Sequence, residues 1–183
     1  MTATPKPRLT HFALFCGDLP VMEDFYTRVM GLTVTDRGEA TSAPVEMVFM
    51  SSAPDEHHQF VLVSGRPVDV NFRLNQQMSF TVVSLDELRA MRDRVLAEDG
   101  EIDNCVTHGN AWSVYFKDPE DNTIEIYVHT PWYVPQPHSR AFDLSKPNEK
   151  IRRETEEHCR DTPGFMTKAA REAEMARMMH LDA

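Results

Sequence analysis

The stretch VTHGNAWSVYFKDPEDNTIEIY, residues 106–127, decides the fold because its pattern is that of a β-hairpin. Apolar and polar residues alternate up to the segment DPEDN, which is typical of a tight turn, and the alternation then resumes. In the second strand Ile124 and Ile126 face one side and Glu125 faces the other, so we expect the carboxylate to be at least half buried. Burying a lone charge costs several kcal/mol. A cation, either a metal ion or a basic side chain, or hydrogen-bond donors must therefore compensate Glu125.

Length and composition limit the classes of protein to which this chain can belong. The 183 residues suffice for one well-packed domain or for two small modules that share a core. A net charge of −10 argues against a nucleic-acid or anionic-membrane partner. No apolar run approaches the length of a membrane span, and the first residues lack the apolar core of a signal peptide. Three widely spaced cysteines suit free thiols, so we expect a soluble cytoplasmic protein.

The first half of the chain has the pattern of a strand, a helix and three more strands. Alternation that starts at Leu9 predicts the first strand. Asp18 and Pro20 are typical of a helix start, and Gly31 is typical of a helix end. Three further strands are predicted over residues 32–37, 45–51 and 58–64.

The same order of elements returns in the second half. Residues 66–76 are polar and rich in turn formers, which indicates a linker. A strand then starts at Gln77, and Ser84 with Glu87 forms a capping box for a helix that Gly100 ends. Three strands follow over residues 102–107, 111–117 and 123–129. The repeat predicts two βαβββ modules, residues 8–65 and 77–130, that share one domain over residues 8–130.

The tail, residues 131–183, differs in composition. Pro131, Pro135 and Pro137 argue against a regular element and indicate an extended arm. A helix should open near residue 148 and run to about Cys159, and Thr162 with Pro163 should cap another. We interpret these C-terminal helices as a cover or as a contact in a homo-oligomer, rather than as a catalytic lid.

Two βαβββ units with a histidine on the first strand and a glutamate on the last resemble the vicinal oxygen chelate superfamily. That superfamily includes glyoxalase I, fosfomycin-resistance proteins and type I extradiol catechol dioxygenases. The segment LTHFALFCGDLPVMEDFYTRVMGL resembles the opening of such a module, with His11 at the first metal-ligand position. The segment DPEDNTIEIY resembles its close, with Glu125 at the last. The resemblance implies an α+β fold in which both modules form a half-open mixed β-barrel around a central cavity, followed by the helical extension.

Three further matches resemble the extradiol dioxygenases in particular. His58 in EHHQFVLV falls where these enzymes place an acid/base histidine near the oxygen site. His108, followed by Asn110 in THGN, falls where they place a second histidine. Tyr115, ten residues before Glu125, falls where they place a tyrosine that binds substrate. The resemblance thus implies catalytic roles for all three.

One departure concerns the metal ligands. In the related metalloenzymes a second ligand histidine opens the fifth strand, and this chain has Gln77 there. Either Gln77 coordinates through its amide oxygen, or His58 (less readily His57) replaces the missing ligand, or the metal has been lost. We expect His11, His58 and Glu125 to be the ligands, with Gln77 as a candidate fourth.

The same side chains also have ordinary structural interpretations. A single histidine on a strand is more often a surface or hydrogen-bonded residue than a ligand. His57 and His58 should point to opposite sides if both lie on a strand, which leaves one of them exposed to solvent. His108 and Asn110 could simply shape a turn, and Tyr115 could be a core aromatic.

The resemblance therefore implies a non-haem Fe(II)-dependent, extradiol-type dioxygenase that acts on a small catecholic aromatic substrate with O2. Mn(II) or another divalent metal is the alternative cofactor. Asn110 and Trp112 are the expected substrate contacts. Asn110 belongs to the THGN match, and Trp112 would supply the apolar surroundings that suit an aromatic ligand. The alternatives are a glyoxalase-like or epimerase-like metal-dependent isomerase or lyase, and a non-catalytic small-molecule-binding protein of the same fold.

Overall fold

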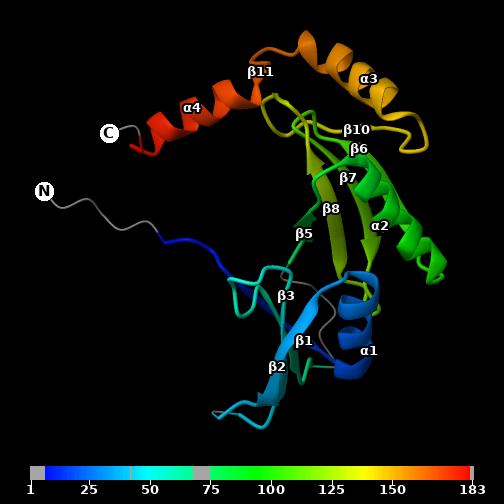
Figure 1. Cartoon of the computed structure of the whole chain (residues 1–183), viewed down its shortest axis with the longest axis vertical. Helices are drawn as coiled ribbons and strands as arrows, with labels where there is room; N and C mark the ends of the chain where they lie inside the picture. The colour runs from blue at the N-terminus through cyan, green and yellow to red at the C-terminus, as the bar shows by residue number, and fades with distance from the viewer. Residues whose placement is uncertain (1–6, 42, 68–74, 182–183) are drawn as a thin grey trace, which may run out of the picture. The chain divides into compact units, whose positions relative to one another are not determined.

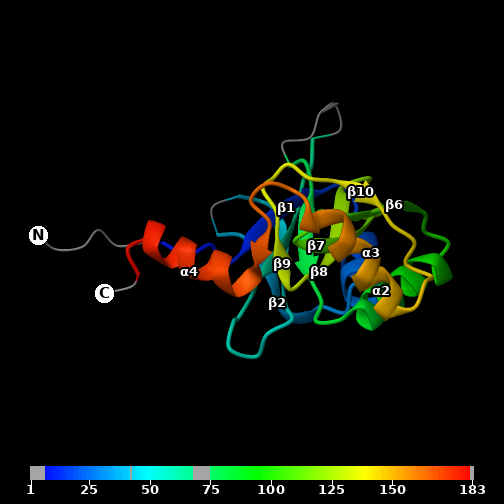
Figure 2. The same ribbon diagram turned by 90° about the horizontal axis from the view of Figure 1, so that it is seen from above.

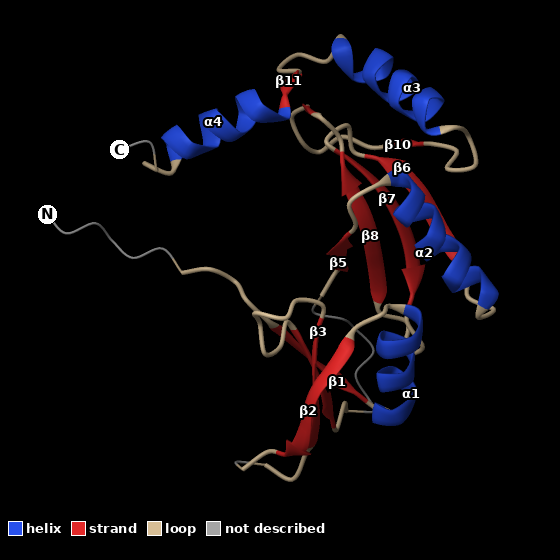
Figure 3. Ribbon diagram, viewed as in Figure 1, coloured by secondary structure: helices blue, strands red, loops and turns tan. Residues whose placement is uncertain are grey.

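The computed structural model describes residues 7–41, 43–67 and 75–181. It has an α+β fold with two mixed sheets and C-terminal helices, as predicted (Figures 1 and 3). The chain divides into two compact units. The first comprises the described residues up to position 67 together with Asp118–Glu120, and the second comprises the rest from Asn75 onward. No helix within these ranges is long and apolar enough to cross a membrane.

The first unit has the predicted order of strand, helix and three strands. Its elements are β1 (Phe12–Cys16), α1 (Leu19–Asp24), the π-helical turn η1 (Phe25–Val29), β2 (Thr33–Glu39), β3 (Glu46–Ser51) and β4 (Phe60–Ser64). The sheet order is β1-β4-β3-β2, and β1 pairs parallel with β4. Asp18 caps α1 by accepting a hydrogen bond from the Val21 amide, as predicted. Gly31 follows η1 with a φ of 79°, a conformation that glycine adopts readily.

A carboxylate from the hairpin turn fixes the start of α1. Glu120 Oε1 accepts hydrogen bonds from the amides of Gly17, at 2.6 Å, and Asp18, at 2.8 Å. Its other oxygen lies 2.9 Å from an Arg66 guanidinium nitrogen. The tip of the hairpin thereby joins the first unit, although the hairpin's strands belong to the second.

The second unit repeats the pattern. Its first elements are β5 (Met78–Thr81), α2 (Leu85–Ala97), β6 (Ile102–Thr107), β7 (Ala111–Lys117) and β8 (Thr123–His129). The last three strands have the predicted bounds. The Glu87 amide donates to Ser84 Oγ at 3.1 Å, which confirms the N-terminal cap, while the Glu87 carboxylate accepts from the Val83 amide. With the tail strand β10 (Arg140–Ala141), the sheet order is β10-β6-β7-β8-β5. β5 is parallel to β8, and the core side of the sheet packs against α2 (Figure 1).

The tail is more regular than predicted. It contains β9 (Trp132–Tyr133), β10 (Arg140–Ala141), α3 (Asn148–Arg160), β11 (Met166–Thr167) and α4 (Lys168–Met178). The prediction that its prolines exclude regular structure was wrong. β9 lies between Pro131 and Pro135, where both residues keep their amides, and it pairs with β11, while β10 follows Pro137 and pairs with β6. The predicted start of α3 is confirmed. Figure 2 shows the tail helices α3 and α4 from above.

The predicted cap of the last helix was also wrong. Thr162 and Pro163 lie in a turn, and α4 begins only after Thr167, whose hydroxyl accepts a hydrogen bond from the Ala170 amide at 3.1 Å. Pairing of β11 with β9 separates the turn from the helix. No residue of α4 is buried, so its apolar side chains remain available for contact.

The buried thiol of Cys16 gives a test of the first unit. Burial, with Glu120 as the next cause, raises the pKa of the Cys16 thiol to about 11. A raised pKa means that the folded state holds the thiol proton more tightly than the unfolded state. The resulting stability is present below pH 9 and is lost as the pH rises toward 11.

We expect the free energy of unfolding to fall by up to about 1.4 kcal/mol per pH unit between pH 9 and 11 through this one group. Urea unfolding across this range should show a shallower pH slope for Cys16→Ala than for the unmodified protein. Equal slopes for both would contradict the assignment.

Candidate functional site

Three polar side chains lie in one row across the second sheet. The register places Tyr115 of β7 and Ser79 of β5 on either side of Glu125 of β8. Gln77 stands two residues before Ser79 and so shares its face of the sheet. The apolar neighbours Ile124 and Ile126 point to the opposite, fully buried side. Strand alternation therefore gathers the polar groups on one face.

The Glu125 carboxylate is buried, with 7% of the residue exposed, and is satisfied by hydrogen-bond donors. Tyr115 OH donates to Oε1 at 2.6 Å, while Ser79 Oγ and Gln77 Nε2 donate to Oε2 at 2.5 and 2.6 Å. Within the described ranges, no lysine or arginine pairs with Glu125, and the nearest basic atom is His108 Nε2 at 3.9 Å. The donors thus provide the compensation that the sequence demands.

His108 is held by the turn between β6 and β7. Gly109 there has a φ of 76°, and a side chain in its place would lie 2.3 Å from Val134. Its amide donates to Thr107 Oγ1 at 3.1 Å, and its carbonyl accepts from Thr130 Oγ1 at 2.7 Å. The backbone of His108 therefore leads into a turn, as the structural interpretation expected. The ring of His108 makes separate contacts.

The ring of His108 extends the hydrogen bonds of Glu125. Its Nδ1 lies 2.8 Å from the carbonyl oxygen of His138, which can only accept, so Nδ1 carries a proton. Its Nε2 lies 3.0 Å from Tyr115 OH. The three side chains thus form a continuous line of hydrogen-bonding groups from His108 through Tyr115 to Glu125.

The environment keeps Tyr115 protonated. Burial raises the pKa of the Tyr115 hydroxyl, and its hydrogen bond to the Glu125 carboxylate raises the pKa further. The hydroxyl is thus a hydrogen-bond donor throughout the physiological range, rather than a phenolate.

The first unit gathers a second group of predicted site residues. Phe12 of β1 stands opposite Phe60 of β4, so His11 and His58 lie together where the two parallel strands begin. Their ring centroids are 4.5 Å apart. Burial lowers the pKa of His58, and the neighbouring His11 and His57 lower it further, which favours the neutral ring that a metal ion binds.

The expected divergence of His57 and His58 was wrong. β4 begins at Phe60, so both histidines lie in the preceding loop, where strand alternation does not apply. Their Nδ1 atoms are 2.9 Å apart. His57 is exposed, and its Nε2 lies 3.9 Å from an Asp36 carboxylate oxygen.

A cavity of about 460 Å³ opens over the polar face of the second sheet. The predicted site residues along it are Gln77, His108, Asn110, Tyr115 and Glu125. Trp112 is absent from its lining: the ring is buried and its Nε1 donates to Thr155 Oγ1 of α3 at 2.8 Å. The structure thus brings Asn110, and not Trp112, to the cavity.

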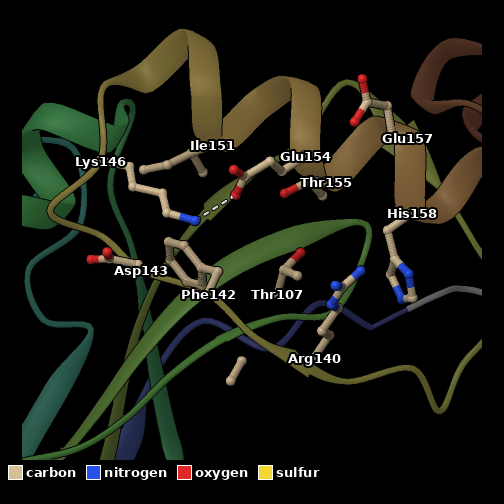
Figure 4. A pocket seen from close by; sticks show the side chains of 11 residues that line it. Thr107, Arg140, Phe142, Asp143, Lys146, Ile151, Glu154, Thr155, Glu157 and His158 are labelled. Carbon is tan, nitrogen blue, oxygen red and sulfur yellow. Dashed lines mark hydrogen bonds and ion pairs between the residues drawn. The ribbon is translucent and has the colours of Figure 1, made fainter.

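A larger cavity of about 590 Å³ lies between β10 and α3 (Figure 4). It contains one ion pair, and one of its carboxylates is bound by hydrogen-bond donors. Lys146 Nζ lies 2.8 Å from Glu154 Oε2, and Asp143 Oδ1 accepts from the amide and hydroxyl of Ser145. None of the predicted site residues lines it. The smaller cavity therefore has the stronger claim to be the functional site.

Sequence reasoning missed two residues of this site. Ser79 donates the shortest hydrogen bond to Glu125, and Gln136 donates to the His108 carbonyl at 2.8 Å. Ser79 could have been found from the parallel pairing of the fifth and eighth strands, which puts it directly opposite Glu125. Gln136 lies in the tail, where no repeating pattern signals a contact.

The histidine and carboxylate side chains of the predicted site can be compared with the ligands that divalent metal ions prefer. Among the described residues, no three histidine, cysteine, aspartate or glutamate side chains cluster as a metal would require. His11 and His58 of the first unit have their rings in contact, and Glu125 of the second unit is a buried carboxylate. Imidazole and carboxylate groups are of the ligand types that suit Fe(II) and Mn(II).

Comparison with known proteins identifies the family. Residues 8–126 match the Glyoxalase/Bleomycin resistance protein/Dioxygenase superfamily, and the chain belongs to it. The predicted resemblance is thereby confirmed.

Two curated relatives have different names. One, biphenyl-2,3-diol 1,2-dioxygenase 3 of Rhodococcus globerulus, is 30% identical over 131 residues, which cover 68% of this chain and 65% of that protein. The match thus spans less than two thirds of the relative. The other, a probable lactoylglutathione lyase of Vibrio cholerae, is 22% identical over 122 residues, covering 65% of this chain and 88% of that protein.

Solved structures agree with the fold. A glyoxylase/bleomycin resistance protein/dioxygenase domain from Frankia has a TM-score of 0.59 at 18% identity, covering 69% of this chain and all of that one. The fosfomycin resistance protein FosX from Listeria monocytogenes, in complex with Mn(II) and sulfate, has a TM-score of 0.54 at 18% identity. It covers 69% of this chain and 95% of its own. At these identities the likeness concerns the fold alone.

Replacing Tyr115 with phenylalanine tests the hydrogen bonds around Glu125. The variant leaves Oε1 of a buried carboxylate without its donor, so the free energy of unfolding should fall by about 1.5–3 kcal/mol in urea titrations. Tyr133→Phe is the matched control, because the Tyr133 hydroxyl makes no hydrogen bond within the described ranges, and its effect should stay within about 0.5 kcal/mol. Equal effects of the two variants would show that Tyr115 does not support Glu125.

Proposed function

We propose that the protein is an extradiol-type dioxygenase that opens a catecholic ring with O2. The observation that carries this proposal is the hydrogen-bonded chain of His108, Tyr115 and Glu125 along one cavity. A glyoxalase or epimerase does not require a histidine and a tyrosine at these positions. The 30% identical relative from Rhodococcus, whose name specifies a diol dioxygenase, supports the same reaction class.

The proposed cofactor is Fe(II), with Mn(II) as the alternative, held by His11, His58 and Glu125. The contact between the two histidine rings and the lowered pKa of His58 support their role as neutral ligands. In this proposal the two modules form the half-open barrel that the resemblance implies. When bound, Fe(II) would supply adjacent open positions for the substrate diol and O2.

Gln77 is the proposed fourth ligand. Its Nε2 donates both to Glu125 Oε2 and to Ser79 Oγ, at 2.6 and 2.9 Å. Its Oε1 has no hydrogen-bond partner within the described ranges and can therefore face a cation. An amide oxygen is a harder and weaker ligand than imidazole, so iron should bind less tightly than in a site with a histidine at this position.

The chain's own residues would bind the diol and move its proton. Tyr115 and His108 lie within hydrogen-bond distance of each other and would hold one phenolic oxygen. The diol proton would then pass to His108 or Tyr115, which lie within hydrogen-bond distance of each other. His58 would act as the acid/base near oxygen, and Asn110 would contact the substrate. In the overall reaction the ring bond beside the diol breaks and both atoms of O2 enter the product.

A non-catalytic small-molecule-binding protein is the second candidate. It is favoured by glutamine at the second ligand position and by the three donors that already satisfy Glu125. A metal-dependent isomerase or lyase, the other alternative, draws support from the 22% identical relative named as a lyase.

Iron content and oxygen consumption separate these functions. Protein loaded with Fe(II) without air should retain about one iron per chain and take up oxygen when catechol is added. His11→Ala and Glu125→Ala should each lower iron content and oxygen uptake at least about tenfold. Loss of a residue that only hydrogen-bonds to a metal ligand already lowers metal affinity or activity about tenfold or more, and loss of a ligand should lower them further. His180→Ala, an exposed histidine near the C-terminus, is the control and should change neither.

Three results would revise the proposal in different ways. Full iron content in both ligand variants would refute the ligand set. Catechol binding without oxygen uptake by the iron-loaded protein would favour the binding protein. Turnover of an isomerase or lyase substrate without oxygen uptake would favour the third class.

A further inference from the structure

The cavity between β10 and α3 is built by the tail of this chain. All of its lining residues except Thr107 follow residue 126, where the family match ends. Its volume of about 590 Å³ falls within the range of small-molecule sites, roughly 300–1,000 Å³. The whole cavity belongs to the second unit. The chemistry of the tail residues therefore decides what the cavity can bind.

The acidic side chains of this cavity have partners of their own. Glu154 pairs with Lys146, and the Asp143 carboxylate accepts two hydrogen bonds from its chain neighbour Ser145. The third carboxylate, that of Glu157, has an oxygen 3.9 Å from an arginine of α3 that lies outside the cavity. A ligand that enters the cavity would therefore meet carboxylates that are already engaged.

One basic side chain of the cavity has no such partner. The Arg140 guanidinium makes no ion pair or hydrogen bond within the described ranges. The chain contains 29 acidic and 19 basic residues, so the missing carboxylate is not a matter of composition. Figure 4 shows Arg140 and His158 on the same side of the cavity, one from β10 and one from α3. Burial lowers the pKa of His158, and Arg140 and then His138 lower it further, as expected next to a guanidinium that no carboxylate neutralises.

A buried hydroxyl adds another hydrogen-bond donor. Thr155 lines the cavity, and only 4% of the residue is exposed. Its Oγ1 accepts the hydrogen bond from Trp112 Nε1 at 2.8 Å, but its own proton has no acceptor within the described ranges. Buried polar groups in folded proteins normally use their hydrogen-bonding capacity. An acceptor atom of a ligand would therefore complete the hydrogen bonds of Thr155.

We propose that this cavity binds a small organic oxyanion, either a phosphate monoester or a carboxylate, through Arg140, His158 and Thr155. A guanidinium offers parallel N–H groups to such an anion, while an imidazole N–H and a hydroxyl each donate one hydrogen bond. The organic part of the ligand would lie against Phe142 and Ile151, the two large apolar side chains of the cavity. The site is separate from the polar cavity of the second sheet, and the proposal does not rest on the proposed function.

A bound anion would act on His108 through Gln136 and His138. The His138 carbonyl oxygen lies 2.8 Å from His108 Nδ1. Gln136 joins the two histidines, because it donates to the His108 carbonyl at 2.8 Å and accepts from the His138 amide at 3.0 Å. The ring of His138 also lies beside that of His158, with the centroids 5.3 Å apart. An anion bound by His158 should therefore change the surroundings of the His108 ring.

Calorimetry on the purified protein without catechol tests the binding site. The probes are inorganic phosphate, phenyl phosphate, benzoate and the uncharged benzyl alcohol, in a buffer whose salt screens non-specific attraction. The tighter of phenyl phosphate and benzoate, which identifies the kind of anion, should bind at least about tenfold more tightly than benzyl alcohol. Phenyl phosphate should also bind more tightly than inorganic phosphate, because it buries an apolar ring.

Substitution of Arg140 tests the proposed ligand contact. Arg140→Gln should weaken the preferred anion at least about tenfold, and Arg140→Lys, which keeps the charge but loses the planar fork, should weaken it less. Arg177→Gln is the matched control. Arg177 is exposed on α4, makes no ion pair within the described ranges and does not line the cavity. This control removes the same charge and should leave the affinity within about twofold, since its distance from the site allows salt to screen it.

Nitrogen-15 NMR of the histidine rings tests the connection to His108, whose signals are assigned with His108→Gln. The preferred anion should shift these signals in the unmodified protein and in Arg177→Gln, but not in Arg140→Gln. His180 is exposed near the C-terminus, and its signals should stay unchanged. Equal urea midpoints of the variants and the unmodified protein would show that all of them fold.

The outcomes separate the binding site from its connection to His108. Absence of binding, equal affinity for benzyl alcohol, or full affinity in Arg140→Gln would overturn the site. Equal affinity for inorganic and phenyl phosphate would overturn the organic part of the ligand. Binding that leaves the His108 signals unchanged would overturn the connection. None of these results depends on iron content or oxygen uptake, so the dioxygenase proposal stands or falls separately.

Discussion

The structure of the second unit depends on one constraint, which is that a carboxylate on a central strand of a sheet must be compensated. Glu125 lies between two buried isoleucines, and Tyr115, Ser79 and Gln77 supply the donors it needs. A buried carboxylate without them would cost several kcal/mol, a large part of a domain's net stability. A buried carboxylate in a cavity is a candidate functional group, and we therefore centre the proposed site on Glu125.

The strand order explains how distant residues reach this carboxylate. β8 lies between β7 and β5. β7 is its antiparallel hairpin partner, and β5 is a parallel strand from earlier in the chain, so residues of both strands flank Glu125. The first unit repeats the parallel pairing with β1 and β4, and there the same geometry brings His11 and His58 together. Each module therefore uses its one parallel pair of strands to assemble polar groups that lie far apart in the sequence.

Much of this could be predicted from the sequence, and the errors have physical reasons. Strands 102–107, 111–117 and 123–129 follow from alternation, because each has one face in the core. Ser79 was missed because its role depends on strand pairing, which local pattern does not encode. The side chains of His57 and His58 were misplaced because the strand begins two residues later than predicted. The short strands of the tail depend wholly on tertiary partners and leave no periodic signal.

We propose that Glu125 is the carboxylate ligand of a metal ion. Anomalous diffraction at the iron edge, from crystals grown with Fe(II) in the absence of air, is the decisive measurement for this proposal. We expect an iron peak within bonding distance of a Glu125 oxygen, with nitrogen atoms of His11 and His58 as further ligands. A Glu125 carboxylate that keeps only its hydrogen bonds to Tyr115, Ser79 and Gln77, with iron absent or bound elsewhere, would contradict it.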